Sequence, residues 1–363
     1  MSKILILGAG ASYDHGITSV DRPPLTKDFF SDSLKKKFGS KYNPLWDYIE
    51  KLELSEDLEE IFGSIESYSI LTADRYRESN IERFGKEFEY CIPVDFLRSY
   101  VIDVIISTTS WLKKGKSCPF HNYLAKDWLR DGDLAISFNY DLIFDMALKR
   151  TGKWHESSGY GAVISLLDSL DYNDYQKSSI LLLKPHGSLN FVRNKQTTTG
   201  ETEYKIGIYS LEKTLKRFGK PPHIVPNWID TISQSKLPNN SFQRYIFCLR
   251  KDTMGQDPFL IIPTPTKPLE DMTTGIMQIG WKRIEKALIT ATDLLSIGFS
   301  WRDSYFASFV RSTIYKRKHP LNLHIVSGNN TVKNVENIFS SLIPSKIQIK
   351  HAGNTFEEFI HRI

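Results

Sequence analysis

The stretch KILILGAGAS, residues 3–12, decides the fold. Its apolar run ends directly in glycines and predicts a buried parallel strand that feeds a tight turn. Gly8 and Gly10 would let the backbone approach a pyrophosphate, and a helix starting after the turn would offer free N–H groups. The dinucleotide pattern GxGxxG is incomplete, because Tyr13 takes the third glycine position. The turn alone therefore also fits a plain strand–helix connection.

Strands and helices alternate through the rest of the chain. Apolar runs that end in small or polar residues predict further strands at 134–138, 180–183, 259–262, 293–297, 323–326 and 347–350. Between most of them, apolar residues recur at spacings of three and four, which is typical of helices. We therefore predict an α/β fold: a Rossmann-like parallel sheet with helices on both faces.

Two segments interrupt this alternation. Residues 30–130 carry helical spacing, as in Leu58, Ile61 and Ile65, and predict a large helical insertion. Residues 193–258 are polar and turn-rich and predict a lid or a second insertion. The Rossmann domain would then consist of residues 1–29 and 131–363.

Composition excludes several functional classes. The chain has 363 residues, 40% of them hydrophobic and 25% charged, which is ordinary for a globular protein. A net charge of +5 is too mild to argue for direct nucleic-acid binding. Cys91, Cys118 and Cys248 form no CxxC pair, so we expect neither a zinc ribbon nor a disulfide framework. No apolar run reaches the ~18 residues of a membrane span, so we expect a cytoplasmic protein. His121, His155 and His223 show no metal-ligand spacing, so we expect no bound metal.

Small and polar residues follow the predicted strands. In open α/β sheets, ligands bind outside the carboxyl ends of the strands. Singly, each residue also fits a structural role: Asn139 or Asp141 as a helix N-cap, His186 as a satisfied core histidine, Ser300 and Asp303 as a cap and a first-turn acid. The candidates at these ends are Gly8, Ala9, Gly10, Ala11, Ser12, Asn139, Asp141, His186, Gly298, Ser300, Asp303, Asn329 and Asn330.

In this order the segments resemble the Sir2 superfamily. Sirtuins carry a GAG-x-S turn, an N-x-D motif, an H-G dipeptide, a G-x-S segment and a late Asn. The sequences FNYD, KPHGSL and IGFS-x-x-D resemble motifs of the bacterial Sir2-like family of antiphage defence. The resemblance spans most of the chain but depends on these five short segments. It departs from deacylase sirtuins, because the zinc-binding cysteines are missing and Phe138 replaces the Gln before Asn139.

The resemblance implies NAD as substrate and assigns roles. Asn139 would orient the ribose and the attacking water, and His186 would act as general base. Asp141 would fix the nicotinamide end or orient Asn139. Asp303 would bind ribose or cap a helix. Gly8, Gly10, Ala11, Ser12 and Ser300 would hold the pyrophosphate, and Asn329 or Asn330 would contact the adenosine ribose. Ala9 and Gly298 would also bind the cofactor, and Arg22 would match the arginine after the first sirtuin turn.

The family implies an NAD+ glycohydrolase that releases nicotinamide and ADP-ribose and depletes cellular NAD+ in abortive infection. Two alternatives stay open: a non-catalytic subunit that binds NAD or ADP-ribose, and an NAD-dependent protein deacylase, which the missing cysteines disfavour. The same resemblance implies a homo-oligomer and a helicase-like ATPase or Argonaute as partner.

Overall fold

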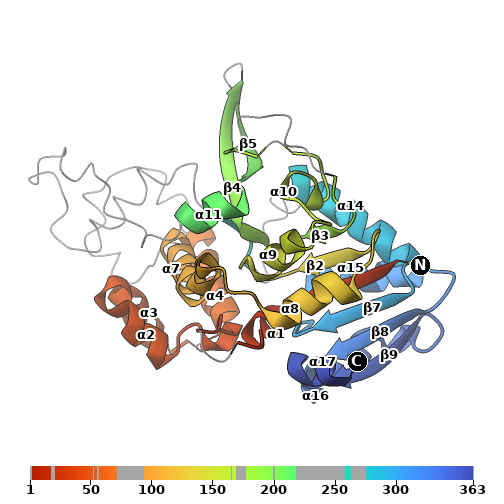
Figure 1. Ribbon diagram of the computed structural model, residues 1–363. Coiled ribbons are helices and arrows are strands. Elements are labelled where there is room, and N and C mark those ends of the chain that lie inside the picture. Colours follow the sequence, from red (N-terminus) through yellow and green to blue (C-terminus); the bar gives the residue numbers. More distant parts are fainter. Residues whose placement is uncertain are drawn as a thin grey trace, which may run out of the picture.

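A six-stranded parallel sheet forms the centre of the protein (Figure 1). The computed structural model describes residues 2–17, 21–51, 53–54, 57–71, 94–164, 166–168, 177–198, 201–217, 258–262 and 275–362. The strand order is β3-β2-β1-β7-β8-β9, and every neighbouring pair is parallel. The strands are β1 (Lys3–Leu7), β2 (Leu134–Ser137), β3 (Leu181–Leu183), β7 (Asp293–Ile297), β8 (Leu321–Val326) and β9 (Ile347–Gly353). The predicted Rossmann-like sheet is confirmed.

The order of the strands fixes where a ligand can bind. From β1 the chain builds outward to β2 and β3, and the later strands build outward on the other side of β1 through β7, β8 and β9. The strand order therefore reverses between β1 and β7. In sheets of this type the crevice at such a switch point is the usual ligand site.

Helices cover both faces of the sheet, as β1 itself dictates. Its side chains alternate between two cores: Ile4 and Ile6 pack in one, Leu5 and Leu7 in the other. The first core is covered by α14 (Gly275–Thr290), α15 (Ser304–Tyr315) and α16 (Asn329–Phe339). The second is covered by α1 (Ala9–Tyr13), α8 (Pro119–Tyr123), α9 (Ile143–Arg150) and α17 (Phe356–Arg362).

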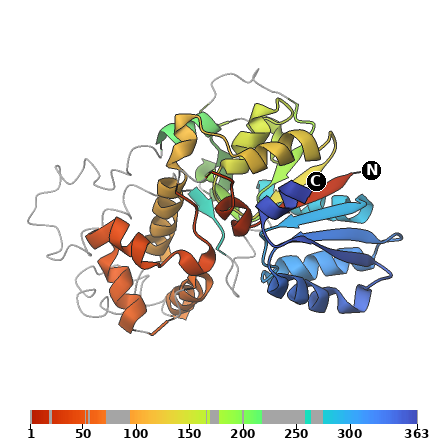
Figure 2. The ribbon, with the colours of Figure 1, turned by 60° about the horizontal axis from the view of Figure 1, so that its bottom comes forward.

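The described residues between β1 and β2 are mainly helical. The α-helices of this part are α2 (Asp32–Phe38), α3 (Asn43–Lys51), α4 (Leu58–Leu71) and α7 (Val94–Thr108). An aromatic cluster around Tyr100 joins α7 to α3: its ring contacts those of Phe30, Tyr42 and Trp46, and its hydroxyl donates to the carbonyl of Phe29. Figures 1 and 2 show these helices beside the sheet, on the side to which the strands point. Residues 72–93 lie outside the described part.

Short helices complete the described chain. They are η1 (Thr26–Asp28), η2 (Gly39–Tyr42), η5 (Ser110–Lys114), η6 (Leu124–Trp128), α10 (Glu156–Gly159), α11 (Leu211–Arg217) and η9 (Ser340–Leu342).

A second, antiparallel sheet corrects one prediction. Its order is β5-β4-β6, with β4 (Gly187–Thr198), β5 (Glu201–Ile208) and β6 (Pro258–Leu260). The predicted strand at 259–262 is therefore wrong as a member of the parallel sheet, because β6 pairs antiparallel with β4. The polar segment 193–258 begins as the hairpin β4–β5 followed by α11, and its residues 218–257 lie outside the described part.

Candidate functional site

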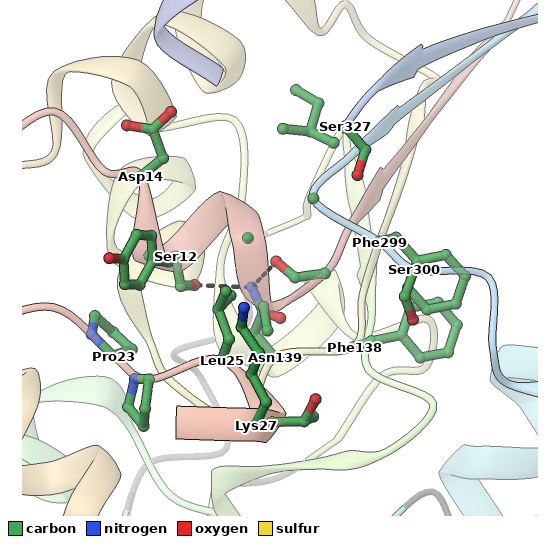
Figure 3. Close-up of a pocket in the computed structure, with 18 of the residues that line it drawn as sticks. Ser12, Asp14, Pro23, Leu25, Lys27, Phe138, Asn139, Phe299, Ser300 and Ser327 are labelled. Carbon is green, nitrogen blue, oxygen red and sulfur yellow. Dashed lines mark hydrogen bonds between the residues drawn. The ribbon is translucent and has the colours of Figure 1, made fainter. Parts of the chain in front are cut away.

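A cavity of about 990 Å³ lies at the carboxyl ends of β1, β2, β7 and β8 (Figure 3). Its volume is in the range of small-molecule and cofactor sites. The strand-end residues come together there although they are far apart in the chain. The predicted site residues that line it are Gly8, Ala9, Gly10, Ser12, Arg22, Asn139, Asp141, His186, Gly298, Ser300, Asp303 and Asn330. Ala11 and Asn329 are not among the lining residues.

Three glycines interlock at the floor of the cavity. A Cβ on Gly8 would lie 2.5 Å from the Gly298 carbonyl oxygen, and one on Gly298 would lie 2.3 Å from the Ala11 nitrogen. A Cβ on Gly10 would lie 2.8 Å from Gly298 Cα. Gly298 also has φ of +60°, in the left-handed region that favours glycine. The close approach of the β1 and β7 loops therefore requires glycine at these positions.

The first turn differs from the sequence-based expectation in its hydrogen bonds. Gly10 N–H donates to Gly298 O over 3.0 Å, and Ala11 N–H donates to Gly8 O over 2.9 Å. The expected free N–H groups are thus already used at these two residues. The turn joins neighbouring strand ends as well as opening onto the cavity.

A chain of hydrogen bonds connects Ser12, Asn139 and Asp141. Asn139 Nδ2 donates to Gly8 O (2.9 Å) and to Ser12 Oγ (2.8 Å). Ser12 Oγ in turn donates to Asp141 Oδ2 (2.7 Å). Figure 3 shows Asn139 beside Ser12, with the contact drawn as a dashed line. Asp141 therefore orients Asn139 through Ser12.

This chain determines what Asn139 can offer a ligand. Gly8 O can only accept, so the amide nitrogen must face it, and both of the nitrogen's hydrogens are then engaged. The remaining group is Oδ1, an acceptor suited to a hydroxyl or a water. Asn139 is 8% exposed, so this acceptor is largely shielded from bulk water.

Asp141 is buried behind Ser12. Burial raises the pKa of its carboxyl, while the Lys184 ammonium and hydrogen bonds from Ile143 N–H and Ser12 lower it. Lys184 is also buried; its Nζ donates to Asp141 O (2.6 Å) and to Asp145 Oδ2 (3.1 Å). These contacts form a polar layer beneath the cavity.

His186 is held by its backbone and by its ring. Its carbonyl accepts the N–H of Ile261 (2.8 Å), which ties it to the antiparallel sheet. Its ring meets the Phe138 ring edge-to-face at 4.8 Å, and Phe138 stacks on Phe299 at 4.4 Å, as Figure 3 shows. Nε2 lies 2.9 Å from Asp303 Oδ2. Next to it, Gly187 has φ of +80°, and a Cβ there would overlap the carbonyl oxygen of Phe259.

The remaining predicted residues are Arg22, Ser300, Asn329 and Asn330, of which Asn329 does not line the cavity. Arg22 is exposed, with its guanidinium 5.3 Å from the centre of the Tyr13 ring. Ser300 Oγ accepts the N–H of Arg302 (3.4 Å). Asn329 and Asn330 are exposed at the start of α16.

Sequence reasoning missed one wall of the cavity. It is built by residues from outside the sheet: 23–27, Phe29, 57–59, Ile105 and 354–357. Residues 354–357 follow β9, so the strand-end rule could have found them. The helical residues carry no comparable signal, since they reach the cavity only through tertiary packing.

Two kinds of feature are absent from the described ranges. There, no three His, Cys, Asp or Glu side chains gather as a metal site would require. None of the helices described is both long and apolar enough to cross a membrane.

Comparisons with known proteins find similarity to solved structures and no match among families or curated proteins. No protein-family model and no curated protein matches the chain. Among solved structures, it is similar to a chain described under the words "Structural Basis for the Mechanism and Regulation of Sir2 Enzymes". The sequence identity is 11% and the TM-score 0.39, over 99% of this chain and 89% of that one. We draw no conclusion from a similarity this low. The fold is established by the order and direction of the strands in the sheet.

Proposed function

We propose that the cavity binds NAD+ and hydrolyses its nicotinamide–ribose bond, releasing nicotinamide and ADP-ribose. The observation that carries the proposal is the convergence of Ser12, Asn139 and His186 on one cavity at the switch point of the sheet. The motif resemblance drawn from the sequence supports NAD+ as the ligand. Cytoplasmic location, homo-oligomerisation and a helicase-like ATPase or Argonaute partner remain predictions from the sequence, as does a role in antiphage defence.

The reaction passes through an oxocarbenium-like transition state, as glycoside hydrolysis does. The bond from ribose C1 to the nicotinamide nitrogen breaks with its electron pair going to nicotinamide, and a water oxygen bonds to C1. Asn139 Oδ1 would accept a hydrogen bond from the ribose or from this water. His186 would take the proton that the water loses. Asp141 would keep Asn139 oriented through Ser12.

Product analysis tests the proposal. Purified protein is incubated with NAD+, with and without an acyl-lysine peptide, and nicotinamide and ADP-ribose are separated by chromatography. We expect both products without peptide. Nicotinamide release only with peptide would instead indicate a deacylase. Tight NAD+ binding by calorimetry with no consumption would indicate a binding subunit. Either of these results contradicts the proposal.

A further inference from the structure

We propose that Lys184 is a positioning residue: its buried ammonium holds Asp141 in place, and with it the chain of hydrogen bonds that orients Asn139. The inference rests on the proposed hydrolysis, because it concerns the same cavity. The Lys184 side chain is 0% exposed. Its Nζ donates to the carbonyl oxygen of Asp141 (2.6 Å) and to Oδ2 of Asp145 (3.1 Å). Burying an ammonium is costly unless it is paired in this way, so the site is built around this charge.

Lys184 also joins the two loops that carry the proposed reacting groups. It directly follows β3, and its carbonyl accepts the N–H of Gly187 (2.9 Å), which closes the turn that contains His186. Its ammonium meanwhile binds the carbonyl of Asp141, in the loop after β2. One residue thus ties the turn of His186 to the loop of Asn139.

The direction of the hydrogen-bond chain depends on the charge of Asp141. Its Oδ1 accepts the N–H of Ile143 (2.9 Å), and its Oδ2 accepts the hydroxyl of Ser12 (2.7 Å). An ionised carboxylate accepts both hydrogen bonds. A proton on Oδ2 would reverse the second contact and take this acceptor away from the Ser12 hydroxyl, which belongs to a residue only 2% exposed. The chain that orients Asn139 therefore requires an ionised Asp141.

Lys184 supplies the charge that opposes protonation of Asp141. Burial raises the pKa of the Asp141 carboxyl, and the Lys184 ammonium lowers it more than the hydrogen bonds to the carboxylate do. Asp145, His15 and Cys118 also interact with this carboxyl. Burial lowers the pKa of His15 and raises that of the Cys118 thiol to about 12, so neither is charged at neutral pH. Asp145 adds a negative charge, and the ammonium between the two carboxylates offsets their repulsion.

Two variants remove the ammonium, and a third is the matched control. Lys184→Met replaces the charged end of the side chain by an apolar one. Because this leaves the Asp145 carboxylate buried without the ammonium, a second variant combines Lys184→Met with Asp145→Asn and removes both charges together. The control is Lys149→Met. Lys149 lies on α9, does not line the cavity, and pairs with the buried carboxylate of Glu156 (2.8 Å).

Kinetics with NAD+ provide the first test. We expect Lys184→Met to lower kcat at pH 7 about 100-fold, the cost of a misplacement near 1 Å, and Lys149→Met to keep the wild-type kcat. Ser12→Ala breaks the link between Asp141 and Asn139. In that background Lys184→Met should change kcat by less than about threefold, because two residues of one chain do not act additively. A fall of about 100-fold in both backgrounds would overturn the inference, as would a wild-type kcat in Lys184→Met.

Carbon-13 NMR of labelled aspartate carboxyls provides a second readout, which needs no activity. Asp141→Asn identifies the Asp141 signal by its loss. We expect this carboxyl to titrate at higher pH in Lys184→Met than in wild type, and at the wild-type pH in Lys149→Met. If Lys184→Met does not fold, the variant that also carries Asp145→Asn replaces it, and its shift is still upward because Lys184 influences the carboxyl more than Asp145 does.

The two readouts separate this inference from the proposed hydrolysis. An Asp141 titration that is unchanged without the ammonium overturns the inference even if the protein hydrolyses NAD+. A titration that moves upward, in a protein whose wild type leaves NAD+ intact, supports the role of Lys184 and contradicts the proposed hydrolysis.

Discussion

Gly298 is the residue on which the geometry of the cavity floor most depends. Its φ of +60° and the 2.3 Å separation between a Cβ added there and Ala11 N leave no room for a side chain. We expect Gly298→Ala to lower the free energy of unfolding by at least about 2 kcal/mol, since both the backbone conformation and the contact become unfavourable. Chemical denaturation measures this loss.

Gly328 offers a matched control for that substitution. It lies in the loop after β8, as Gly298 lies in the loop after β7, but its φ is −61° and a Cβ there meets nothing within 4 Å. Gly328→Ala should cost no more than about 1 kcal/mol, mostly as a poorer helix N-cap. Equal losses in the two variants would contradict the close-approach argument.

The buried carboxyl of Asp141 gives a second prediction for a single residue, namely how the stability of the protein depends on pH. Burial raises the pKa of its folded-state carboxyl above the ordinary value of 3.8. Its contribution to stability is therefore fully present below that ordinary value and is lost as pH rises through the raised pKa. The stability of wild type relative to Asp141→Asn should decline with pH across this window, by at most about 1.4 kcal/mol per pH unit. Urea denaturation of both proteins at several pH values measures it, and a flat difference would refute the burial argument.

At the scale of elements, α8 contributes a buried histidine whose pKa is lowered by burial, whereas burial raises the pKa of Asp141. His121 packs against the rings of Phe144 and Phe356, and burial lowers its pKa to about 3. Stability from its neutral form is present above 6.5, the ordinary pKa of histidine, and is lost as pH falls toward 3.

Substitution of His121 tests this acid sensitivity. The ring lies 2.8 Å from Cys118 Sγ, and glutamine can keep a polar contact there without titrating. Between pH 6.5 and 3, wild type should lose stability relative to His121→Gln, by up to about 1.4 kcal/mol per pH unit. Thermal unfolding across this range measures the difference. A constant gap between the two proteins would show that His121 does not titrate as its burial requires.

The elements also show what a sequence can and cannot predict. Apolar runs ending in small or polar residues identified the strands of the parallel sheet, because a buried parallel strand needs such a run. The run at 259–262 was misassigned because its pattern does not distinguish parallel from antiparallel pairing. In the structure this run pairs antiparallel with β4, which begins at Gly187 with φ of +80°.

At the scale of the whole molecule, the site combines parts with very different sequence signals. Strand-end residues such as Asn139 and His186 could be predicted, because the sheet brings its carboxyl ends to one edge. The contact between His186 and Asp303 could not, since the two lie 117 residues apart in the chain. Arg302 likewise reaches the helical segment, donating to Thr26 Oγ1 over 2.9 Å, which no local pattern predicts.

The central claim is that this cavity breaks NAD+ with His186 as base. The most direct measurement is the rate of nicotinamide release at saturating NAD+ by wild type and by His186→Ala. We expect the variant to bind NAD+ but to release nicotinamide at least about 100-fold more slowly, as for loss of a general base. Release at the wild-type rate by His186→Ala would contradict the account.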